Sequence, residues 1–163
     1  MMPGEVMSPV GSRLQAMQAS DVEAVLAIEQ RAYEFPWSRG NFIDSLSAGY
    51  LAQVLRAADG GLLGYFLAMQ GVDELHLLNI TVLPECQGQG LARLMLDALQ
   101  ALAREHGGAQ IWLEVRQGNE RARRVYARYG FAEVGLRRAY YPAAEGRRED
   151  AVLMSLRLAE GTV

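Results

Sequence analysis

The sequence predicts an α/β domain built around a mixed sheet. Apolar and polar residues alternate from Ile111 to Arg116, which is the period of a strand. Apolar residues recur at spacings of three and four from Leu91 to Leu102, which is the period of an amphipathic helix. The expected order is helix, helix, three strands, helix, strand, helix, two strands. Consecutive strands without crossovers favour a mixed sheet over a purely parallel one.

Capping residues and glycines mark the expected helix ends. Ser20 and Glu23 form a capping-box pattern for a first helix, which Phe35-Pro36-Trp37 breaks. Ser38 is expected to cap a second, short helix that ends at Gly49. The later helices are expected from Leu91 to Gly107-Gly108 and from Asn119 to Tyr129.

The strands are bounded by turn residues. Asp59-Gly60-Gly61 is typical of a hairpin turn because glycine accepts a positive φ. Pro84 ends the strand that precedes a glycine-rich turn. The strands are expected at 50–57, 62–69, 75–82, 111–116, 131–136 and 151–158.

All sixteen basic residues are arginine. The absence of lysine excludes chemistry that needs its amine, such as a Schiff-base enzyme, a phosphate-loop nucleotidase or a protein kinase. Cys86, His76 and His106 are too few for a disulfide framework or a zinc site built from Cys and His, so no metal is expected. His76 is interpreted as an ordinary strand residue, and His106 as a cation near a helix C-terminus.

The net charge of −3 is an average over two unlike regions. From Arg116 to Arg148 nine arginines stand against three glutamates, a net of +6, whereas residues 1–85 carry ten acidic groups and four arginines, a net of −6. The overall charge argues against direct nucleic acid binding. The basic region can attract an anionic ligand, and the acidic region a basic partner.

One domain is expected at 13–160, after a flexible leader at 1–12. The leader lacks the apolar run of a signal peptide, and no other stretch approaches the roughly twenty apolar residues of a membrane span. A reduced cytoplasmic location without a membrane partner is the expectation that follows.

The turn Gln87-Gly88-Gln89-Gly90-Leu91-Ala92 joins a strand to an amphipathic helix. Its glycines allow successive N–H groups to face one concavity at a helix N-terminus, which favours a phosphate; a plain flexible connection is the alternative. Arg93 stands where a dinucleotide-binding fingerprint needs Gly or Ala. The pattern formed by Gln87, Gly90 and Ala92 resembles the acetyl-CoA pyrophosphate loop of the GNAT superfamily of N-acetyltransferases.

Glu114 and Tyr126 are the candidate catalytic residues. A carboxylate in mid-strand is unusual, although a solvent-facing strand or a Glu114–Arg116 pair would also explain it. An aromatic residue such as Tyr126 on a short helix usually belongs to the core, but a buried hydroxyl needs a partner. Acyl transfer to an amine needs one proton acceptor and one donor, and these two residues suit those tasks.

A wider set of sequence runs is shared with one branch of that superfamily. The runs are Ile28-Glu29-Gln30-Arg31-Ala32, Phe35-Pro36-Trp37-Ser38, Trp112-Leu113-Glu114-Val115-Arg116, Asn119, Tyr126, Gly130-Phe131, Arg138-Ala139-Tyr140-Tyr141-Pro142 and Arg148-Glu149-Asp150-Ala151. Together they resemble the RimI family, whose members acetylate the N-terminal alanine of a small-subunit ribosomal protein. Gly88 departs from the family, which often has Arg at this position.

The RimI resemblance implies the GNAT fold, acetyl-CoA as co-substrate, and a direct transfer without an acyl-enzyme. By this resemblance, Glu114 corresponds to the general base of the family and Tyr126 to its general acid. The implied acetyl-CoA contacts are Ile80, Thr81, Val82, Gln87, Gly88, Gln89, Gly90, Leu91, Ala92 and Asn119.

Two aromatic segments are candidates for the substrate side. Trp37, Tyr140 and Tyr141 are expected in connections, where they either form walls of a peptide groove or pack as loop plugs; the resemblance favours the groove. Two other functions stay open: acetylation of a small-molecule amine, and a non-catalytic acyl-CoA-binding module.

Overall fold

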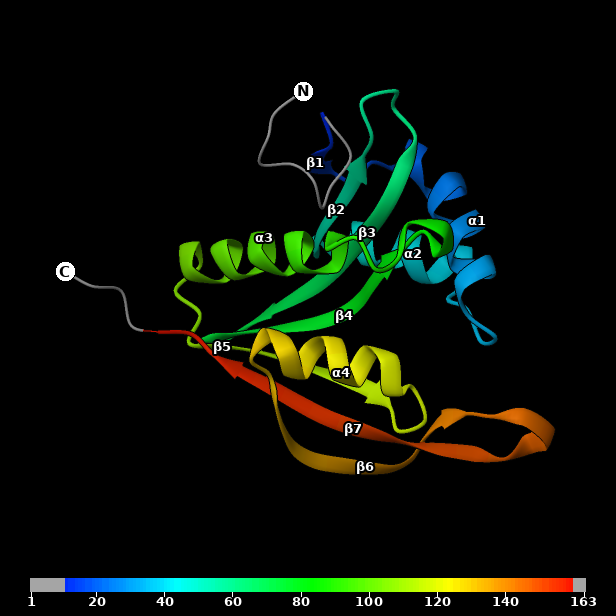
Figure 1. Cartoon of the computed structure of the whole chain (residues 1–163), viewed down its shortest axis with the longest axis vertical. Helices are drawn as coiled ribbons and strands as arrows, with labels where there is room; N and C mark the ends of the chain where they lie inside the picture. Colours follow the sequence, from blue (N-terminus) through cyan, green and yellow to red (C-terminus); the bar gives the residue numbers. More distant parts are fainter. Residues whose placement is uncertain (1–10, 160–163) are drawn as a thin grey trace. The chain divides into compact units, whose positions relative to one another are not determined.

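The computed structural model describes residues 11–159. It confirms the predicted α/β class, with a mixed, mostly antiparallel sheet and flanking helices (Figure 1). Within these residues the strand order is β1-β2-β3-β4-β5-β7-β6. The strands are β1 (Arg13–Ala16), β2 (Leu51–Arg56), β3 (Leu62–Gly71), β4 (Glu74–Val82), β5 (Gln110–Arg116), β6 (Ala132–Pro142) and β7 (Arg148–Arg157). The helices are α1 (Val22–Ala32), α2 (Arg39–Ser47), α3 (Leu91–Glu105) and α4 (Glu120–Tyr129), with 3-10 turns η2 (Ala19–Asp21), η3 (Pro84–Cys86) and η4 (Ala144–Gly146).

The chain divides into two compact units. The first contains the residues up to Met69 together with Asn79–Ala98, and the second contains Gln70–Leu78 and the residues from Leu99 onward. Strands β3 and β4 and helix α3 contribute residues to both units.

In the first unit, β1, β2 and β3 pair antiparallel. The β2–β3 hairpin closes at the predicted turn, where Gly60 has a φ of +91° and Asp59 Oδ1 accepts a hydrogen bond from the Gly61 N–H at 2.9 Å. Gly64 allows β3 to approach β4 closely, because a Cβ there would lie 2.6 Å from the Thr81 carbonyl oxygen. The core cluster contains Met17, Val22, Val25, Leu26, Ile28, Phe42, Val54, Tyr65 and Leu67.

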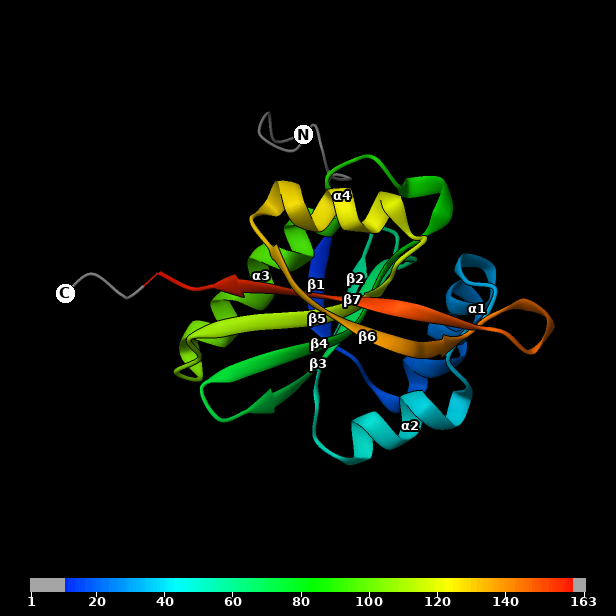
Figure 2. The same cartoon turned by 90° about the horizontal axis from the view of Figure 1, so that it is seen from below.

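Helices α1 and α2 lie close together in this unit (Figure 2). The predicted cap of α2 is confirmed, since Ser38 Oγ accepts a hydrogen bond from the Asn41 N–H at 3.1 Å. The predicted cap at Ser20 is wrong. Ser20 lies inside η2, where the Asp21 carboxylate accepts a hydrogen bond from the Gln18 N–H at 2.8 Å and fixes a 3-10 turn ahead of α1.

In the second unit, β5 pairs with β4 in parallel and with β7 antiparallel, and β6 pairs with β7. The predicted alternation along β5 is confirmed: Ile111, Leu113 and Val115 are buried, and the residues between them are half-buried. The side chains on the buried face meet Val152 and Met154 of β7, which are also buried. Glu114 therefore projects from the opposite, half-buried face of a well-packed strand.

Two strand predictions were incomplete. Strand β1 was missed, because its four residues carry too short an apolar pattern and depend on pairing with β2. Strand β6 extends to Pro142 instead of ending near residue 136, and forms with β7 a long hairpin (Figure 1). The register of β6 shifts between Arg137 and Tyr141, and Ala139 has a φ of +49°. This irregularity explains why the sequence resembled a loop.

The predicted leader at 1–12 lies outside the described residues except for its last two positions. Among the helices of residues 11–159, none has the length and the apolar character needed to cross a membrane.

Candidate active site

The predicted phosphate turn, residues 87–92, follows η3 and includes the first two residues of α3. Gly88 and Gly90 have φ values of +81° and +80°, the left-handed region that favours glycine. Within the described part of the chain, the N–H groups of Gly88, Gln89 and Gly90 donate no hydrogen bond. Free N–H groups at the start of a long helix are the usual donors to a phosphate.

The β4 residues that precede the turn take part in an internal network. Tyr33 O–H donates to the Ile80 carbonyl at 3.2 Å, and the Thr81 hydroxyl donates to Asn79 Oδ1 at 2.8 Å. Thr81 is buried, whereas Ile80 and Val82 are half-buried. The Thr81 side chain thus serves the fold.

Glu29 is the centre of this network, a role that the sequence did not indicate. It is 2% exposed. Its Oε1 accepts hydrogen bonds from Tyr65 O–H at 2.7 Å and from the Asn79 amide at 3.0 Å, and its Oε2 accepts one from the Trp37 N–H at 2.9 Å. The Trp37 ring lies 5.1 Å from that of Phe42 and packs against the core. A hollow of about 490 Å³ beside it is lined by Trp37, Asn41, Asp44, Ser45, Ala48 and Tyr50.

Glu114 lies in the second unit, and its side chain is 6% exposed. Its Oε1 accepts a hydrogen bond from His76 Nε2 at 2.9 Å. Arg137 Nη1 lies 2.8 Å from Oε2, yet this buried oxygen has no hydrogen-bond partner among the described residues. The alternative of a Glu114–Arg116 pair is wrong, because Arg116 pairs with Glu149 at 3.1 Å.

Opposing effects act on the Glu114 carboxyl. Burial raises its pKa, but the hydrogen bond from His76, the charges of Arg137 and His76, and the nearby Tyr140 together outweigh burial. The pKa of Glu114 therefore lies below its ordinary value, and the group is ionised at neutral pH. Burial, followed by the charge of Glu114, raises the pKa of Tyr141, so its hydroxyl stays protonated.

His76 is not an ordinary strand residue. Strands β4 and β5 place it opposite Trp112, and the two rings stack with centroids 3.6 Å apart and planes inclined by 8°. Glu114 follows Trp112 by two positions and projects to the same face of β5. The sequence predicts both strands but not how their residues align, so no pattern within either strand indicated the contact between His76 and Glu114.

Asn119 and Tyr126 belong to α4. Asn119 is its predicted cap, confirmed by a hydrogen bond from the Ala122 N–H to Asn119 Oδ1 at 3.1 Å. The half-buried Tyr126 places its ring edge-on to Phe131, with centroids 5.8 Å apart. Tyr126 thus packs partly as a core residue, as one interpretation of the sequence expected.

Tyr140 and Tyr141 lie in β6, not in a connection as predicted. Their rings are 4.9 Å apart and edge-on. The Arg137 guanidinium lies 4.8 Å from the Tyr140 ring, and that of Arg116 lies 4.5 Å from the Tyr141 ring. Both positions allow a cation–π attraction.

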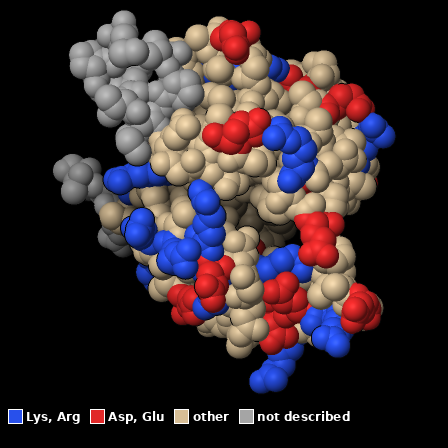
Figure 3. Space-filling model, turned by 45° about the vertical axis from the view of Figure 1, so that its right-hand side comes forward, with Lys and Arg blue, Asp and Glu red and all other residues tan. Residues whose placement is uncertain are grey.

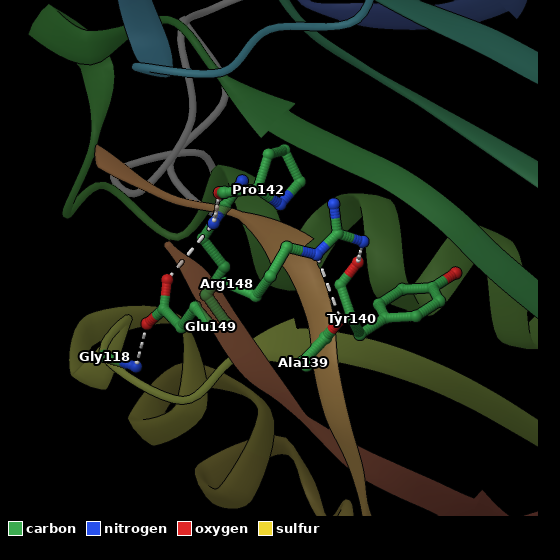
Figure 4. Close-up of polar contacts among 7 residues, drawn as sticks. Gly118, Ala139, Tyr140, Pro142, Arg148 and Glu149 are labelled. Carbon is green, nitrogen blue, oxygen red and sulfur yellow. Dashed lines mark hydrogen bonds and ion pairs between the residues drawn. The ribbon is translucent and has the colours of Figure 1, made fainter. Parts of the chain in front are cut away.

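Side chains of β7 hold the irregular part of β6 (Figure 4). Arg148 donates from Nε to the Ala139 carbonyl at 3.2 Å and from Nη2 to the Tyr140 carbonyl at 3.0 Å. Asp150 Oδ1 accepts a hydrogen bond from the Ala139 N–H at 2.8 Å. These bonds supply the polar partners that the bulge removes from the strand ladder.

A second set of contacts joins this hairpin to the end of β5 (Figure 4). Arg116 Nη1 donates to the Pro142 carbonyl at 2.7 Å and to Glu149 Oε1 at 3.1 Å. Glu149 Oε2 accepts a hydrogen bond from the Gly118 N–H at 2.8 Å. Tyr141 is therefore held from β5 as well as from its own hairpin.

The positive region predicted between Arg116 and Arg148 is partly neutralised by ion pairs. Five of its arginines lie within 4.0 Å of a carboxylate; they are Arg116, Arg123, Arg124, Arg137 and Arg147. On the face drawn in Figure 3, arginine and acidic side chains lie next to one another at several places. The formal net charge of the segment therefore overstates the field that it presents to a ligand.

Comparisons with known proteins agree with these features. The acetyltransferase (GNAT) family matches residues 22–131. The chain belongs to the GNAT family of acetyltransferases. It is 38% identical over 143 residues to the [ribosomal protein bS18]-alanine N-acetyltransferase of Escherichia coli (strain K12), covering 88% of this chain and 95% of that one. The Haemophilus influenzae protein of the same name is also 38% identical, with 88% and 97% coverage.

A solved structure gives the same result for the fold. The crystal structure of the ribosomal-protein-S18-alanine N-acetyltransferase from Escherichia coli matches this GNAT chain with a TM-score of 0.83 and 36% identity, covering 93% of this chain and 96% of that one. The resemblance to the RimI family is thereby confirmed.

The GNAT match includes Trp37, the phosphate turn, Glu114 and Tyr126, but ends before Tyr140. In residues 11–159 of the GNAT chain, no three His, Cys, Asp or Glu side chains are grouped as metal ligands would be. Cys86 is a half-buried free thiol in η3.

Proposed function

We propose that this acetyltransferase moves the acetyl group of acetyl-CoA to the N-terminal alanine of a small-subunit ribosomal protein. The relatives that span nearly all of the chain are named for this reaction on ribosomal protein bS18. The observation that carries the chemistry is the Glu114 carboxylate, which is buried, ionised and left with one oxygen, Oε2, that accepts no hydrogen bond in the described chain.

Acetyl-CoA is proposed to bind through the phosphate turn and the end of β4. The N–H groups of the turn, which donate no hydrogen bond to the described residues, and its two left-handed glycines fit a pyrophosphate, and this fit does not depend on lysine. When bound, acetyl-CoA supplies the activated acetyl group. The residues assigned to it are Ile80, Thr81, Val82, Gln87, Gly88, Gln89, Gly90, Leu91, Ala92 and Asn119.

The reaction forms an N–C bond and breaks a C–S bond, so two protons must move. An N-terminal ammonium, with a pKa of about 7.7–8.0, must lose a proton before it attacks, and the leaving thiolate gains one. We assign the first proton to Glu114, directly or through water, and the second to the Tyr126 hydroxyl. Backbone N–H groups near Thr81 would stabilise the charge that develops on the carbonyl oxygen.

The substrate is proposed to be the N-terminus of a basic ribosomal protein in the cytoplasm. The net −6 of residues 1–85 favours a basic tail. Trp37, Tyr140 and Tyr141 are assigned to this peptide; Arg148 donates a hydrogen bond to the Tyr140 carbonyl, and the Arg116 guanidinium lies against the Tyr141 ring. We assign no nucleic acid or membrane partner.

The substrate class is tested with the purified protein, acetyl-CoA and peptides that differ only in a first residue of Ala, Ser or Met, beside spermidine as a free amine. CoA release is measured together with the mass of each peptide. We expect acetylation of the Ala peptide. Exclusive acetylation of spermidine would contradict the proposal. Mass spectrometry of ribosomal-protein N-termini from cells with and without the protein identifies the natural substrate.

The base is tested by Glu114→Gln, with Glu133→Gln as a matched control. Glu133 is in the same unit but half exposed and paired with Arg123 on the surface. We expect kcat of the Glu114 variant to fall by about 100-fold or more at neutral pH, with little change in KM for acetyl-CoA. Equal activity of both variants would refute the assignment. Full activity of Cys86→Ala is expected for direct transfer.

The phosphate turn is tested by Gly90→Ala, with Gly49→Ala as the control. The two glycines have φ values of +80° and +79°, so both substitutions introduce similar backbone strain. Gly49 follows the end of α2, and a methyl group added there would meet no other atom within 4 Å. Only Gly90→Ala is expected to raise KM for acetyl-CoA, by about 10-fold, since about 1–2 kcal/mol opposes the left-handed conformation of alanine.

A further inference from the structure

We propose that His76 is a positioning residue for acetyl transfer: by donating a hydrogen bond to Glu114 Oε1, it fixes the carboxylate so that Oε2 is the oxygen left to accept the proton of the amine. This inference rests on the proposed role of Glu114 as base and assigns a second residue to that step.

The hydrogen bond itself is the first support. His76 Nε2 lies 2.9 Å from Glu114 Oε1, and the two side chains are only 14% and 6% exposed. A carboxylate oxygen can only accept, so the imidazole nitrogen that faces it carries the proton. Shielded from water, this bond persists where an exposed one would exchange with solvent.

Stacking fixes the direction of that bond. The imidazole ring lies 3.6 Å from the Trp112 ring and nearly parallel to it, and the β4–β5 pairing sets the two residues directly opposite each other. Smaller rotations of His76 about χ2 would break the stack, and a half-turn would break the bond to Glu114, so the two contacts together hold Nε2 in one direction. Only an imidazole combines a flat ring of this size with an N–H donor at its far edge.

The two oxygens of Glu114 are consequently unequal. Oε1 accepts the hydrogen bond from the stacked His76 ring, whereas Oε2 is buried and accepts no hydrogen bond among the described residues. Arg137, from β6, lies near Oε2 but is 48% exposed, and its guanidinium also lies over the Tyr140 ring. Arg137 thus contributes charge, and His76 contributes orientation.

The groups that face Glu114 come from β4 and β6. His76 is on β4, and Arg137, Tyr140 and Tyr141 are on β6. Without the His76 donor, the effect of burial, which raises the pKa of Glu114, is opposed only by Arg137 and Tyr140. The acid limb of the pH–rate profile, where Glu114 becomes protonated, should then move to higher pH.

Two substitutions separate the hydrogen bond from the stacking. His76→Phe keeps a ring against Trp112 but cannot donate, whereas His76→Gln can donate but cannot stack in the same way. His106→Gln is the control, since His106 is exposed at the end of α3. With acetyl-CoA and the Ala peptide, we expect His76→Phe to lower kcat by about 10- to 100-fold, with KM for acetyl-CoA unchanged and the acid limb raised by about one pH unit.

His76→Gln is expected to stay within about threefold of the parent protein, because the donor is retained. A larger loss in His76→Gln than in His76→Phe would assign His76 a packing role and overturn the proposal, as would a His76→Phe profile equal to the parent's. His76→Met, which also cannot donate, replaces the Phe variant if that one does not fold. Glu114→Gln is measured in parallel: an active Glu114→Gln refutes the base itself, whereas an inactive Glu114→Gln beside a fully active His76→Phe refutes only the role of His76.

Discussion

Replacement of Glu29 by Gln tests whether the buried network of the first unit holds the fold. The change keeps the size and shape of the side chain but removes its charge. Glu29 accepts three hydrogen bonds, from Tyr65, Asn79 and the Trp37 N–H. A glutamine oxygen can accept the first two, but its amide group then faces the Trp37 N–H, donor against donor.

The expected loss follows from these contacts. A hydrogen bond to a charged acceptor contributes about 1.5–3 kcal/mol, and a buried donor without a partner costs about 1–3 kcal/mol. Since these terms overlap, we expect the free energy of unfolding to fall by about 3 kcal/mol. With an m-value of about 2 kcal/mol/M in urea, the midpoint should shift by about 1.5 M.

The assay is urea denaturation followed by far-UV circular dichroism, with a check that the m-value is unchanged. Glu23→Gln is the control, because Glu23 is on the same helix but exposed and paired with Arg39 on the surface. We expect the control to match the parent protein. A midpoint for Glu29→Gln within about 0.2 M of the control would show that the network contributes little.

Two further predictions concern other contacts. Gly64→Ala should lower the free energy of unfolding by about 2–3 kcal/mol, because the added methyl would lie 2.6 Å from a carbonyl oxygen. Gly135→Ala is the control in the same denaturation experiment, because a methyl added there would meet no other atom within 4 Å. Arg137→Gln should raise the pKa of Glu114, because it removes a charge that lowers it, so the acid limb of the pH–rate profile moves to higher pH. Because the pKa of Glu114 is lower in the folded than in the unfolded protein, its carboxylate stabilises the fold above the unfolded-state pKa. This stabilisation is lost as the pH falls through the folded-state pKa. In Arg137→Gln the difference between the two pKa values is smaller, so the melting temperature should depend less on pH in the acid range. An unchanged acid limb and an unchanged pH dependence of melting would contradict the second prediction.

The sequence was most informative where structure depends on near neighbours. The caps at Ser38 and Asn119 were correctly predicted, and Gly88 and Gly90 have the positive φ values that a glycine-rich turn allows, because each of these features depends on residues within a few positions. Strand β1 was missed because it depends on pairing with β2, which is distant in sequence. The end of β6 was missed because side chains of β7 hold it in place.

The candidate site shows the same division. Glu114 became a candidate because a carboxylate in mid-strand is unusual, but its partners depend on how β5 aligns with β4 and how β6 lies against β7. His76 is 38 residues away in sequence, and no spacing rule connects the two. Likewise, Glu29 lies in an ordinary helical pattern, and only the fold places three donors around it.

The bulged arm of β6 has a consequence for local unfolding. Nearly all of β6 is exposed, whereas β7 buries Ala151, Val152 and Met154. The order of residues 138–142 thus rests on polar contacts from Arg148 and Asp150 of β7 and from Arg116 of β5. Opening this arm exposes little apolar surface, so amide exchange there should be nearly independent of dilute denaturant, while salt, by screening the charged partners, should speed it. The tyrosines proposed to meet the peptide would then open and close at a rate set by ionic strength and largely uncoupled from the core.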